Sequence, residues 1–516
     1  MLREQLVAKE NRKNIFFCMV SLMALFLINW YWFEPLKEKI FLIGDDIRFY
    51  NIVKSSDNII KTVFTNDAGV YRPLSYLVMA VAVKILGVDS LAYFRLNLIF
   101  NMAIILSVYK TVHMIAKKNK ICISFLGSFL YIVAVYSYYG VTQLLGLMEQ
   151  MCVFFSVWFF YFIIKYIRSG NKKDYICSVV IYLLVLLTHE RFLALLGVYI
   201  VLNVFILYDK DIKVRIKNMV IALLPAIYFI VMKVFVFKVK LFVGTAQIPV
   251  EFSLTRTIEY ILQSLLSMFG IILGQKHLMG HLFSEYSKME QLMILLVCVL
   301  LIVCFIIYVY QCIIADRQGR REELQTLLVF IFVEGATIIC YSISSRIEMR
   351  QIYVPYTIFV IYVMYCISKI NVSFEITSCA IFFSIVIVTI NAYVFRQNVD
   401  SLFFLRAMSF GKTGYENSIA MNENIEDYKI YIEENGEITW AMLLSDEKDI
   451  FYMYDKEVEW ERFEDLDLLQ QNVQEDLKND KKVKILYINA NINNQVNSLE
   501  YVDKNQQVDV KAQMGR

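Results

Sequence analysis

Long apolar runs separated by short polar segments fill the first three quarters of the chain. A helix needs about 20 predominantly apolar residues to cross the hydrocarbon core of a bilayer. Lipid offers no partners for backbone groups, so each run is expected to be helical. The pattern predicts about eleven membrane spans, at residues 15–33, 93–115, 121–138, 145–166, 175–189, 191–208, 219–237, 290–314, 325–343, 352–368 and 374–395.

Basic residues cluster in alternate links between these runs. The clusters are Arg3, Lys9, Arg12 and Lys13; Lys117, Lys118 and Lys120; Lys165, Arg168, Lys172 and Lys173; Lys210, Lys213, Arg215 and Lys217; and Arg317, Arg320 and Arg321. Cytoplasmic loops are enriched in Lys and Arg. The alternation therefore predicts a multi-pass plasma membrane protein whose N-terminus is cytoplasmic and whose last segment lies outside.

This topology predicts two domains, a transmembrane domain at 1–395 and a soluble extracytoplasmic domain at 396–516. The first domain has long outer loops at 34–92 and 238–290, in which segments 77–87 and 257–273 are expected to be helices lying at the membrane surface. The second domain is acidic, with 14 Lys and Arg residues against 24 Asp and Glu. The predicted fold class is thus an all-α polytopic membrane protein with a small C-terminal α+β domain.

Within the C-terminal domain, residues 428–443 alternate in polarity and contain Asn435-Gly436, which predicts a β-hairpin. Residues 449–460 are expected to add a strand, 464–480 a helix and 482–490 another strand. The last 25 or so residues are expected to be loosely ordered.

Composition agrees with a membrane protein and narrows the chemistry. Of the 516 residues, 58% are hydrophobic and 19% are charged, against about half and a quarter in soluble proteins. The ten cysteines lie in or beside apolar runs and form no CxxC pair, so zinc and redox sites have no support. The sequence also has no phosphate-binding loop of the nucleotide-binding type.

Two adjacent carboxylates, Asp45 and Asp46, follow the first span on the predicted outer side. A carboxylate near an apolar surface can act as a base towards a hydroxyl. A carboxylate pair can also hold a divalent cation, although the sequence identifies no certain cofactor. The simpler interpretation is a solvated acidic loop.

Several outer basic residues could bind a phosphate. Arg72 precedes Pro73, which is typical of a helix start, and a guanidinium there can pair with an anion. Arg95 lies in the outer part of the second span, where a charge is costly. Arg346 and Arg350 are spaced to share one face of a helix. Each could instead anchor the chain at the lipid headgroups.

Other polar residues lie beside these arginines. His189 and Glu190, followed by Arg191, interrupt an apolar stretch, while Glu149 and Glu334 lie inside apolar spans. Charged residues in such places are functional candidates or join packed helices. His277 and His281 are four residues apart, but no third metal ligand accompanies them.

Taken together, these motifs resemble the GT-C superfamily of membrane glycosyltransferases, in particular the protein O-mannosyltransferase and aminoarabinose-transferase branch. The resemblance consists of Asp45-Asp46, YRPLSYLVMAVAVKILG (71–87), YFRLN (93–97), THERF (188–192) and RIEMRQIYVPY (346–356). The last segment departs from the family pattern because Gln351 separates Arg350 from Ile352-Tyr353. The C-terminal domain resembles no named family.

The resemblance implies an inverting glycosyltransferase that uses a polyprenyl-phosphate sugar and an acceptor hydroxyl on a glycan or protein, at the outer membrane face. Asp45 or Asp46 would be the base, and Arg72, Arg95, Arg346 and Arg350 would hold the donor phosphate. The substrate pocket would include Arg48, Tyr71, His189, Glu190 and Tyr353. A flippase for lipid-linked sugars, a glycan polymerase or ligase, and an inactive scaffold remain as alternatives.

Overall fold

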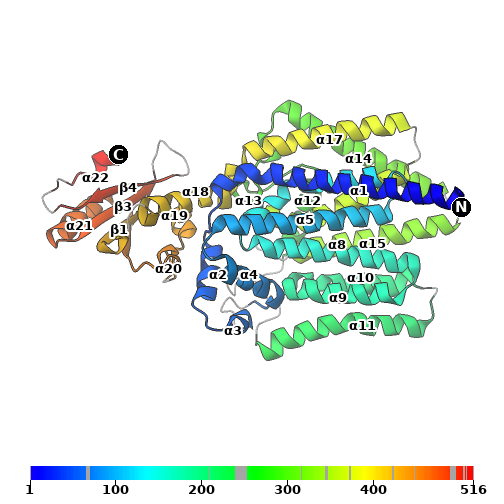
Figure 1. The fold of residues 1–516 in the computed structure, drawn as a ribbon, viewed down its shortest axis with the longest axis horizontal. Helices are drawn as coiled ribbons and strands as arrows, with labels where there is room; N and C mark the ends of the chain where they lie inside the picture. Colours follow the sequence, from blue (N-terminus) through cyan, green and yellow to red (C-terminus); the bar gives the residue numbers. More distant parts are fainter. Residues whose placement is uncertain are drawn as a thin grey trace.

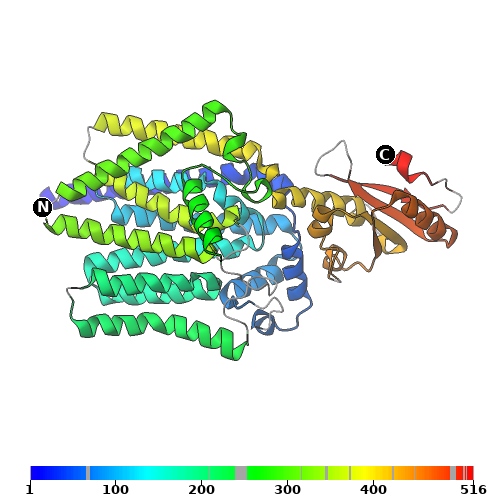
Figure 2. The same cartoon turned by 180° about the vertical axis from the view of Figure 1, so that it is seen from behind.

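The computed structural model describes residues 2–64, 70–208, 210–238, 253–314, 317–342, 347–370, 374–420, 424–446, 448–488, 495–503, 506 and 508–514. Long helices form one body, and a smaller unit containing a β-sheet, here called the tail unit, lies at one end of it (Figure 1). The start of the first helix lies at the opposite end of the bundle from the tail unit in both views (Figure 2). Predicted residue Arg346 lies outside the described residues.

The bundle contains α1 (Leu2–Phe33), α5 (Ser90–Ile115), α6 (Lys120–Ile132), α8 (Gly146–Ser169), α9 (Lys172–Thr188), α10 (Leu196–Val201), α11 (Ile212–Ile230), α14 (Lys288–Ile314), α15 (Arg317–Ser342), α16 (Tyr353–Lys369) and α17 (Phe374–Gln397). Nine of the predicted spans overlap one of these helices along most of their length, whereas 121–138 continues past the end of α6 and 191–208 contains only the short α10 between two irregular helical segments. Among the described residues, however, six helices are long and apolar enough to cross a membrane, or seven if the bent pair Lys120–Ile132 and Val135–Thr142 is one span. The chain is a polytopic helical membrane protein, and the predicted count of eleven spans is not confirmed.

Shorter helices lie between the bundle helices along the chain, and those between residues 45 and 86 lie at the tail-unit end of the bundle (Figure 1). They are η1 (Glu34–Lys39), α2 (Asp45–Lys54), α3 (Ile59–Phe64), α4 (Pro73–Leu86), η2 (Val135–Ser137), α7 (Tyr138–Thr142), η3 (Glu190–Leu195), α12 (Leu254–Met268), α13 (Lys276–Met279), η7 (Phe283–Glu285) and η8 (Met349–Ile352). Helices occupy both segments for which surface helices are predicted, but α4 begins four residues before 77 and α12 ends before 273. Pro73 occupies the first turn of α4, where its missing N–H costs nothing.

Three further segments continue or link bundle helices. η4 (Leu202–Ile206) follows α10 and η5 (Val231–Val236) follows α11, each as a π-helix. η9 (Val399–Ser401) leads from α17 into the tail unit.

The tail unit consists of a four-stranded sheet and small helices. Its elements are α18 (Phe403–Tyr415), η10 (Glu416–Ala420), η11 (Ile425–Asp427), β1 (Tyr428–Glu433), α19 (Gly436–Ala441), α20 (Ile450–Met453), β2 (Glu459–Phe463), α21 (Leu466–Lys478), β3 (Lys482–Ile488), β4 (Val496–Tyr501) and α22 (Val510–Gln513). The strand order is β2-β1-β3-β4. β1 runs parallel to β2 and β3, while β3 and β4 are antiparallel. The predicted α+β class is confirmed.

Three details of the tail prediction are wrong. The Asn435-Gly436 pair does not form a hairpin, because the Asn435 side chain accepts a hydrogen bond from Glu437 N and begins α19. Most of 449–460 is not strand, since Asp449 caps α20 in the same way and β2 begins only at Glu459. The last residues are not loose throughout, because β4 pairs along β3. The predicted helix and final strand are confirmed as α21 and β3.

Candidate active site

The first turn of α2 presents its two aspartates differently. Gly44 has a φ of 45°, a conformation that favours glycine, and a Cβ there would lie 2.5 Å from the Trp440 ring. The chain turns sharply at this point into α2. As a result the Asp45 side chain is exposed, whereas Asp46 is buried.

Asp46 anchors the turn that leads into α8. Its carboxylate oxygens accept hydrogen bonds from the backbone N–H groups of Leu145 at 2.9 Å and Leu144 at 3.2 Å. Burial raises the pKa of Asp46 to about 7, although these two hydrogen bonds oppose the shift. Because both oxygens are engaged, Asp46 holds α2 in place and Asp45 is the carboxylate left facing outward.

Arg350 lies close to Asp45. Its Nη1 donates to the Tyr139 hydroxyl at 2.7 Å, and its guanidinium lies 4.6 Å from the centre of that ring. Its Nε lies 2.6 Å from Glu348 Oε2. The charge of Asp45 acts on both Arg350 and Tyr139. An exposed carboxylate and a fixed guanidinium therefore lie within electrostatic range of each other.

Arg72 forms a bidentate ion pair with Glu190. Nε lies 2.9 Å from Oε2 and Nη2 3.0 Å from Oε1, and both side chains are largely buried. Burial works to raise the pKa of Glu190, but the adjacent Arg72 charge and its hydrogen bonds outweigh it and lower the pKa to about 2. The pair joins the start of α4 to the turn after α9.

His189 lies at the centre of a group of cations. Arg191, Arg72, Arg350 and Lys233 are all close enough for their charges to act on it, and its Nδ1 accepts a hydrogen bond from Arg191 N at 3.4 Å. These four side chains are here called the cationic cluster. Glu149, Glu190 and Glu348 form ion pairs with Arg191, Arg72 and Arg350, and Asp45 also acts on Arg350.

Two members of the cationic cluster were not among the predicted phosphate ligands. Arg191 pairs with Glu149 of α8 and its guanidinium lies 3.9 Å from the centre of the Tyr341 ring. Lys233, on η5, is completely buried, and its charge acts on Glu190 and Arg72. A lone lysine inside the apolar run 219–237 was a usable signal, because a charge inside a span is costly.

The remaining predicted residues lie elsewhere or play packing roles. Arg95 is exposed on α5, and Lys37 lies within range of its charge. The structure therefore does not bring Arg95 to the cationic cluster. Arg48 lies 4.0 Å from Asp446 of the tail unit. Tyr71 is buried and stacks on Phe237 with ring centres 5.1 Å apart.

Tyr353 belongs to a buried hydrogen-bond network beneath the site. Its hydroxyl contacts the Tyr131 hydroxyl and donates to Asn101 Oδ1 at 3.2 Å. Asn101 also donates to Asn29 Oδ1 at 2.6 Å. The network ties α1, α5, α6 and α16 together, as expected for fully paired polar groups in a core.

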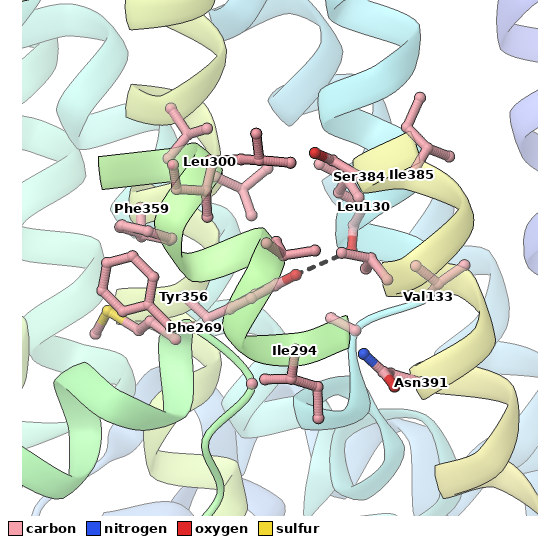
Figure 3. A pocket seen from close by; sticks show the side chains of 18 of the residues that line it. Leu130, Val133, Phe269, Ile294, Leu300, Tyr356, Phe359, Ser384, Ile385 and Asn391 are labelled. Carbon is pink, nitrogen blue, oxygen red and sulfur yellow. Dashed lines mark hydrogen bonds between the residues drawn. The ribbon is translucent and has the colours of Figure 1, made fainter. Parts of the chain in front are cut away.

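An apolar cavity of about 310 Å³ lies among α6, α12, α14, α16 and α17 (Figure 3). Aliphatic and aromatic side chains dominate its wall, including Leu130, Phe359 and Ile385. Tyr356 projects across it and donates to Leu130 O at 3.5 Å. Tyr136 also lines the cavity, and its element η2 packs against η8, which carries Arg350.

The described residues contain no group of three or more His, Cys, Asp or Glu side chains placed to hold a metal ion. Asp46 has both oxygens occupied by backbone N–H groups. His281 instead lies 3.6 Å from Glu285. A divalent cation at Asp45 and Asp46 therefore has little support from the donor set.

No family model matches the sequence, and no curated protein matches it. Among solved structures, ArnT from Cupriavidus metallidurans bound to undecaprenyl phosphate superposes with a TM-score of 0.46 and 9% identity, covering 93% of this chain and 97% of that one. The apo form of ArnT gives a TM-score of 0.35 and 10% identity, covering 91% and 92%. Such distant similarities assign no family, so the function must be argued from the site.

Proposed function

We propose that the chain is a GT-C-type inverting glycosyltransferase that moves a sugar from a polyprenyl-phosphate donor to an acceptor hydroxyl at the outer membrane face. One observation carries the proposal. Exposed Asp45 lies within electrostatic reach of Arg350, beside a buried cationic cluster and one end of an intramembrane apolar cavity. A base, a phosphate site and a lipid-chain site are the parts this reaction needs.

Asp45 would take the proton of the acceptor hydroxyl as its oxygen attacks the anomeric carbon of the sugar. The bond between that carbon and the phosphate oxygen breaks, and its electron pair leaves with the polyprenyl phosphate. The proton stays on Asp45 until solvent removes it. Since the leaving phosphate needs no proton, one general base is sufficient. Asp46 would position Asp45 through its hydrogen bonds to the start of α8.

The cationic cluster would stabilise charge on the departing phosphate. Fixed positive groups in a site sheltered from water act most strongly where charge develops in the transition state. Arg350 is the best placed of them, because the charge of Asp45 acts on it and its side chain is partly exposed. Arg72 uses Nε and Nη2 for Glu190, and its Nη1 donates to Met148 Sδ at 3.8 Å. A phosphate oxygen would replace this sulfur as the acceptor, because a charged oxygen accepts a stronger hydrogen bond than a thioether.

The apolar cavity would hold part of the polyprenyl chain. Burial of each CH₂ group contributes about 0.8 kcal/mol, so an aliphatic wall suits a long hydrocarbon. The donor headgroup would then lie at the end near Tyr136 and Arg350. This arrangement favours an enzyme of lipid-linked sugars for cell-surface glycan or glycoprotein modification, with the tail unit outside and the N-terminus cytoplasmic.

The test is release of polyprenyl phosphate from a panel of short-chain polyprenyl-phosphate sugars by the full-length protein in lipid nanodiscs, with water or an added oligosaccharide hydroxyl taking the sugar. The proposal expects release from at least one donor, and parallel samples with EDTA determine whether a divalent cation is needed. Donor binding without release from any member, unchanged by Asp45→Asn, would instead favour a flippase, which needs the phosphate site but no base.

A further inference from the structure

The tail unit has a polar cleft of its own. The cavity, about 690 Å³, lies between α20 and β2. Its wall contains Asp446, Asp449, Tyr452, Lys456, Glu457 and Trp460. A ligand site of this kind combines apolar surface with a few converging polar groups.

The Trp460 ring is held in place before any ligand arrives. Its Nε1 donates to Asp449 Oδ2 at 2.7 Å. The other oxygen of Asp449 accepts from the backbone N–H groups of Phe451 at 2.8 Å and Tyr452 at 3.1 Å. A fixed ring offers a flat apolar surface at little entropic cost on binding.

The polar groups of the cleft favour a ligand rich in hydroxyls. Carboxylates only accept hydrogen bonds, and hydroxyls donate them. Glu457 is exposed here. Asp446 is partly exposed; its Oδ1 accepts from Lys448 N at 3.0 Å, and its Oδ2 lies 4.0 Å from Arg48 and keeps room for a hydroxyl donor. The two cations of the wall already have partners, since Lys456 lies 3.5 Å from Glu426 and Arg462 3.1 Å from Glu434. An anionic ligand would gain little from them.

Other ligand classes fit the cleft less well. No metal-binding group is found in the described part of the chain. β2 is an edge strand, but Glu459, Glu461 and Arg462 place charges along it, and charged edges resist the addition of a peptide strand.

The cleft is joined directly to the helix that carries Asp45. Asn51 of α2 donates to Lys448 O at 2.5 Å and Asp449 O at 2.9 Å, and Lys54 donates to Tyr452 O at 2.9 Å. Arg48, one turn after Asp45, lies 4.0 Å from Asp446 of the cleft wall. In Figure 1, α20 of the tail unit lies beside α2, against which it packs.

We propose that this cleft binds a neutral oligosaccharide, the acceptor chain, with sugar rings on Trp460 and hydroxyls on Asp446 and Glu457, and directs one end towards Asp45. The part concerning the acceptor rests on the proposed glycosyltransferase function. The binding of neutral sugar by the cleft stands independently of it.

The experiment measures binding of four neutral tetrasaccharides, chitotetraose, cellotetraose, maltotetraose and mannotetraose, by saturation-transfer NMR. The full-length protein is held in nanodiscs, because maltoside detergents would themselves offer a sugar. At least one tetrasaccharide should bind, and Trp460→Ala should weaken it about tenfold or more, as expected for a central aromatic contact. Trp460→Phe should give an intermediate loss, because it keeps a ring but loses the hydrogen bond to Asp449.

Two further variants make the result decisive. Glu457→Gln changes an exposed side chain and should leave the fold intact. It should weaken tetrasaccharide binding severalfold. Glu475→Gln, exposed on α21 away from the cleft, should leave it unchanged. Failure of all four sugars to bind, binding insensitive to both Trp460→Ala and Glu457→Gln, or binding only of a peptide or a uronic-acid tetrasaccharide would overturn the inference.

Polyprenyl phosphate release, measured without any tetrasaccharide present, separates the two proposals. Release without tetrasaccharide binding would leave the transferase standing and remove the cleft as the acceptor site. Tetrasaccharide binding without release from any donor would leave the cleft standing and remove the transferase.

Discussion

Arg72 and Glu190 face each other through two hydrogen bonds, 2.9 Å and 3.0 Å long, although 118 residues separate them in the chain. The pair connects α4 to η3 at the end of the bundle. It therefore fixes the segment between α1 and α5 against the turn that carries His189 and Arg191. The cationic cluster depends on this connection.

Removing one member of the pair should destabilise the protein strongly. Glu190→Leu leaves Arg72 buried without its carboxylate, a change that costs about 3–5 kcal/mol in comparable buried pairs. The double variant Arg72→Met/Glu190→Leu should recover most of this loss, because two apolar groups replace two charges. Thermal unfolding in nanodiscs measures both. Polyprenyl phosphate release should stay low in the double variant, and full activity there would mean that the pair serves stability alone.

Arg350 and Arg95 make a matched test of the phosphate site. Both were candidates from the sequence, but only Arg350 lies in the cationic cluster, while Arg95 is exposed on α5. Arg350→Ala should lower the release rate by about 10²-fold or more, the size of effect seen when one stabilising donor is removed. Arg95→Ala should change it less than about twofold under the same account. Equal losses in the two variants would contradict the placement of the phosphate.

Asp46 predicts a particular pH dependence of stability. Burial raises its folded-state pKa from 3.8 to about 7. Its contribution to the free energy of unfolding is therefore complete below about pH 4 and is lost as pH rises through about 7. Asp449, whose pKa burial raises to about 6, adds a similar loss at lower pH. Asp46→Asn does not titrate, so the melting temperature of the wild type relative to this variant should fall between about pH 5 and pH 8.5. A constant or rising difference would be inconsistent with the buried carboxyl described here.

The apolar cavity can be tested with two valines on α17. Val388 lines the cavity, whereas Val386 is exposed on the outside of the same helix. Val388→Trp should fill part of the space and raise KM for a long-chain donor more than for a short-chain donor, because only the long chain needs the cavity. Val386→Trp adds the same bulk outside and should affect neither. An equal effect on both donors would argue against a chain-binding role.

Local chemistry allowed the elements of the site to be predicted from sequence. Pro73 marked the start of α4, and the apolar runs located the bundle helices. The sequence identified the Asp45-Asp46 motif, but not that Asp45 is exposed while Asp46 is buried and hydrogen-bonded. That difference depends on Asp46 reaching Leu144 and Leu145, about a hundred residues away, and no local pattern encodes such a contact.

The predictions for the tail unit failed at polar side chains that suit either a turn between strands or the N-cap of a helix. Asn435 suits a tight hairpin turn, and it suits equally the N-cap of a helix. The sheet favours the second use, because β1 pairs in parallel with β2 and β3 and therefore needs a crossover between them. Asp449 similarly caps α20 within a segment whose aromatic residues predicted a strand.

The initial rate of polyprenyl phosphate release by Asp45→Asn, measured beside wild type and Asp46→Asn with an accepted donor, tests the central claim most directly. A lost general base typically lowers the rate by about 10²–10⁴-fold, so Asp45→Asn should lose activity to this extent while keeping the wild-type melting temperature and donor binding. Asp46→Asn should also lower stability, because Asp46 holds α2 in place. Near wild-type release by a stable Asp45→Asn protein would contradict the account.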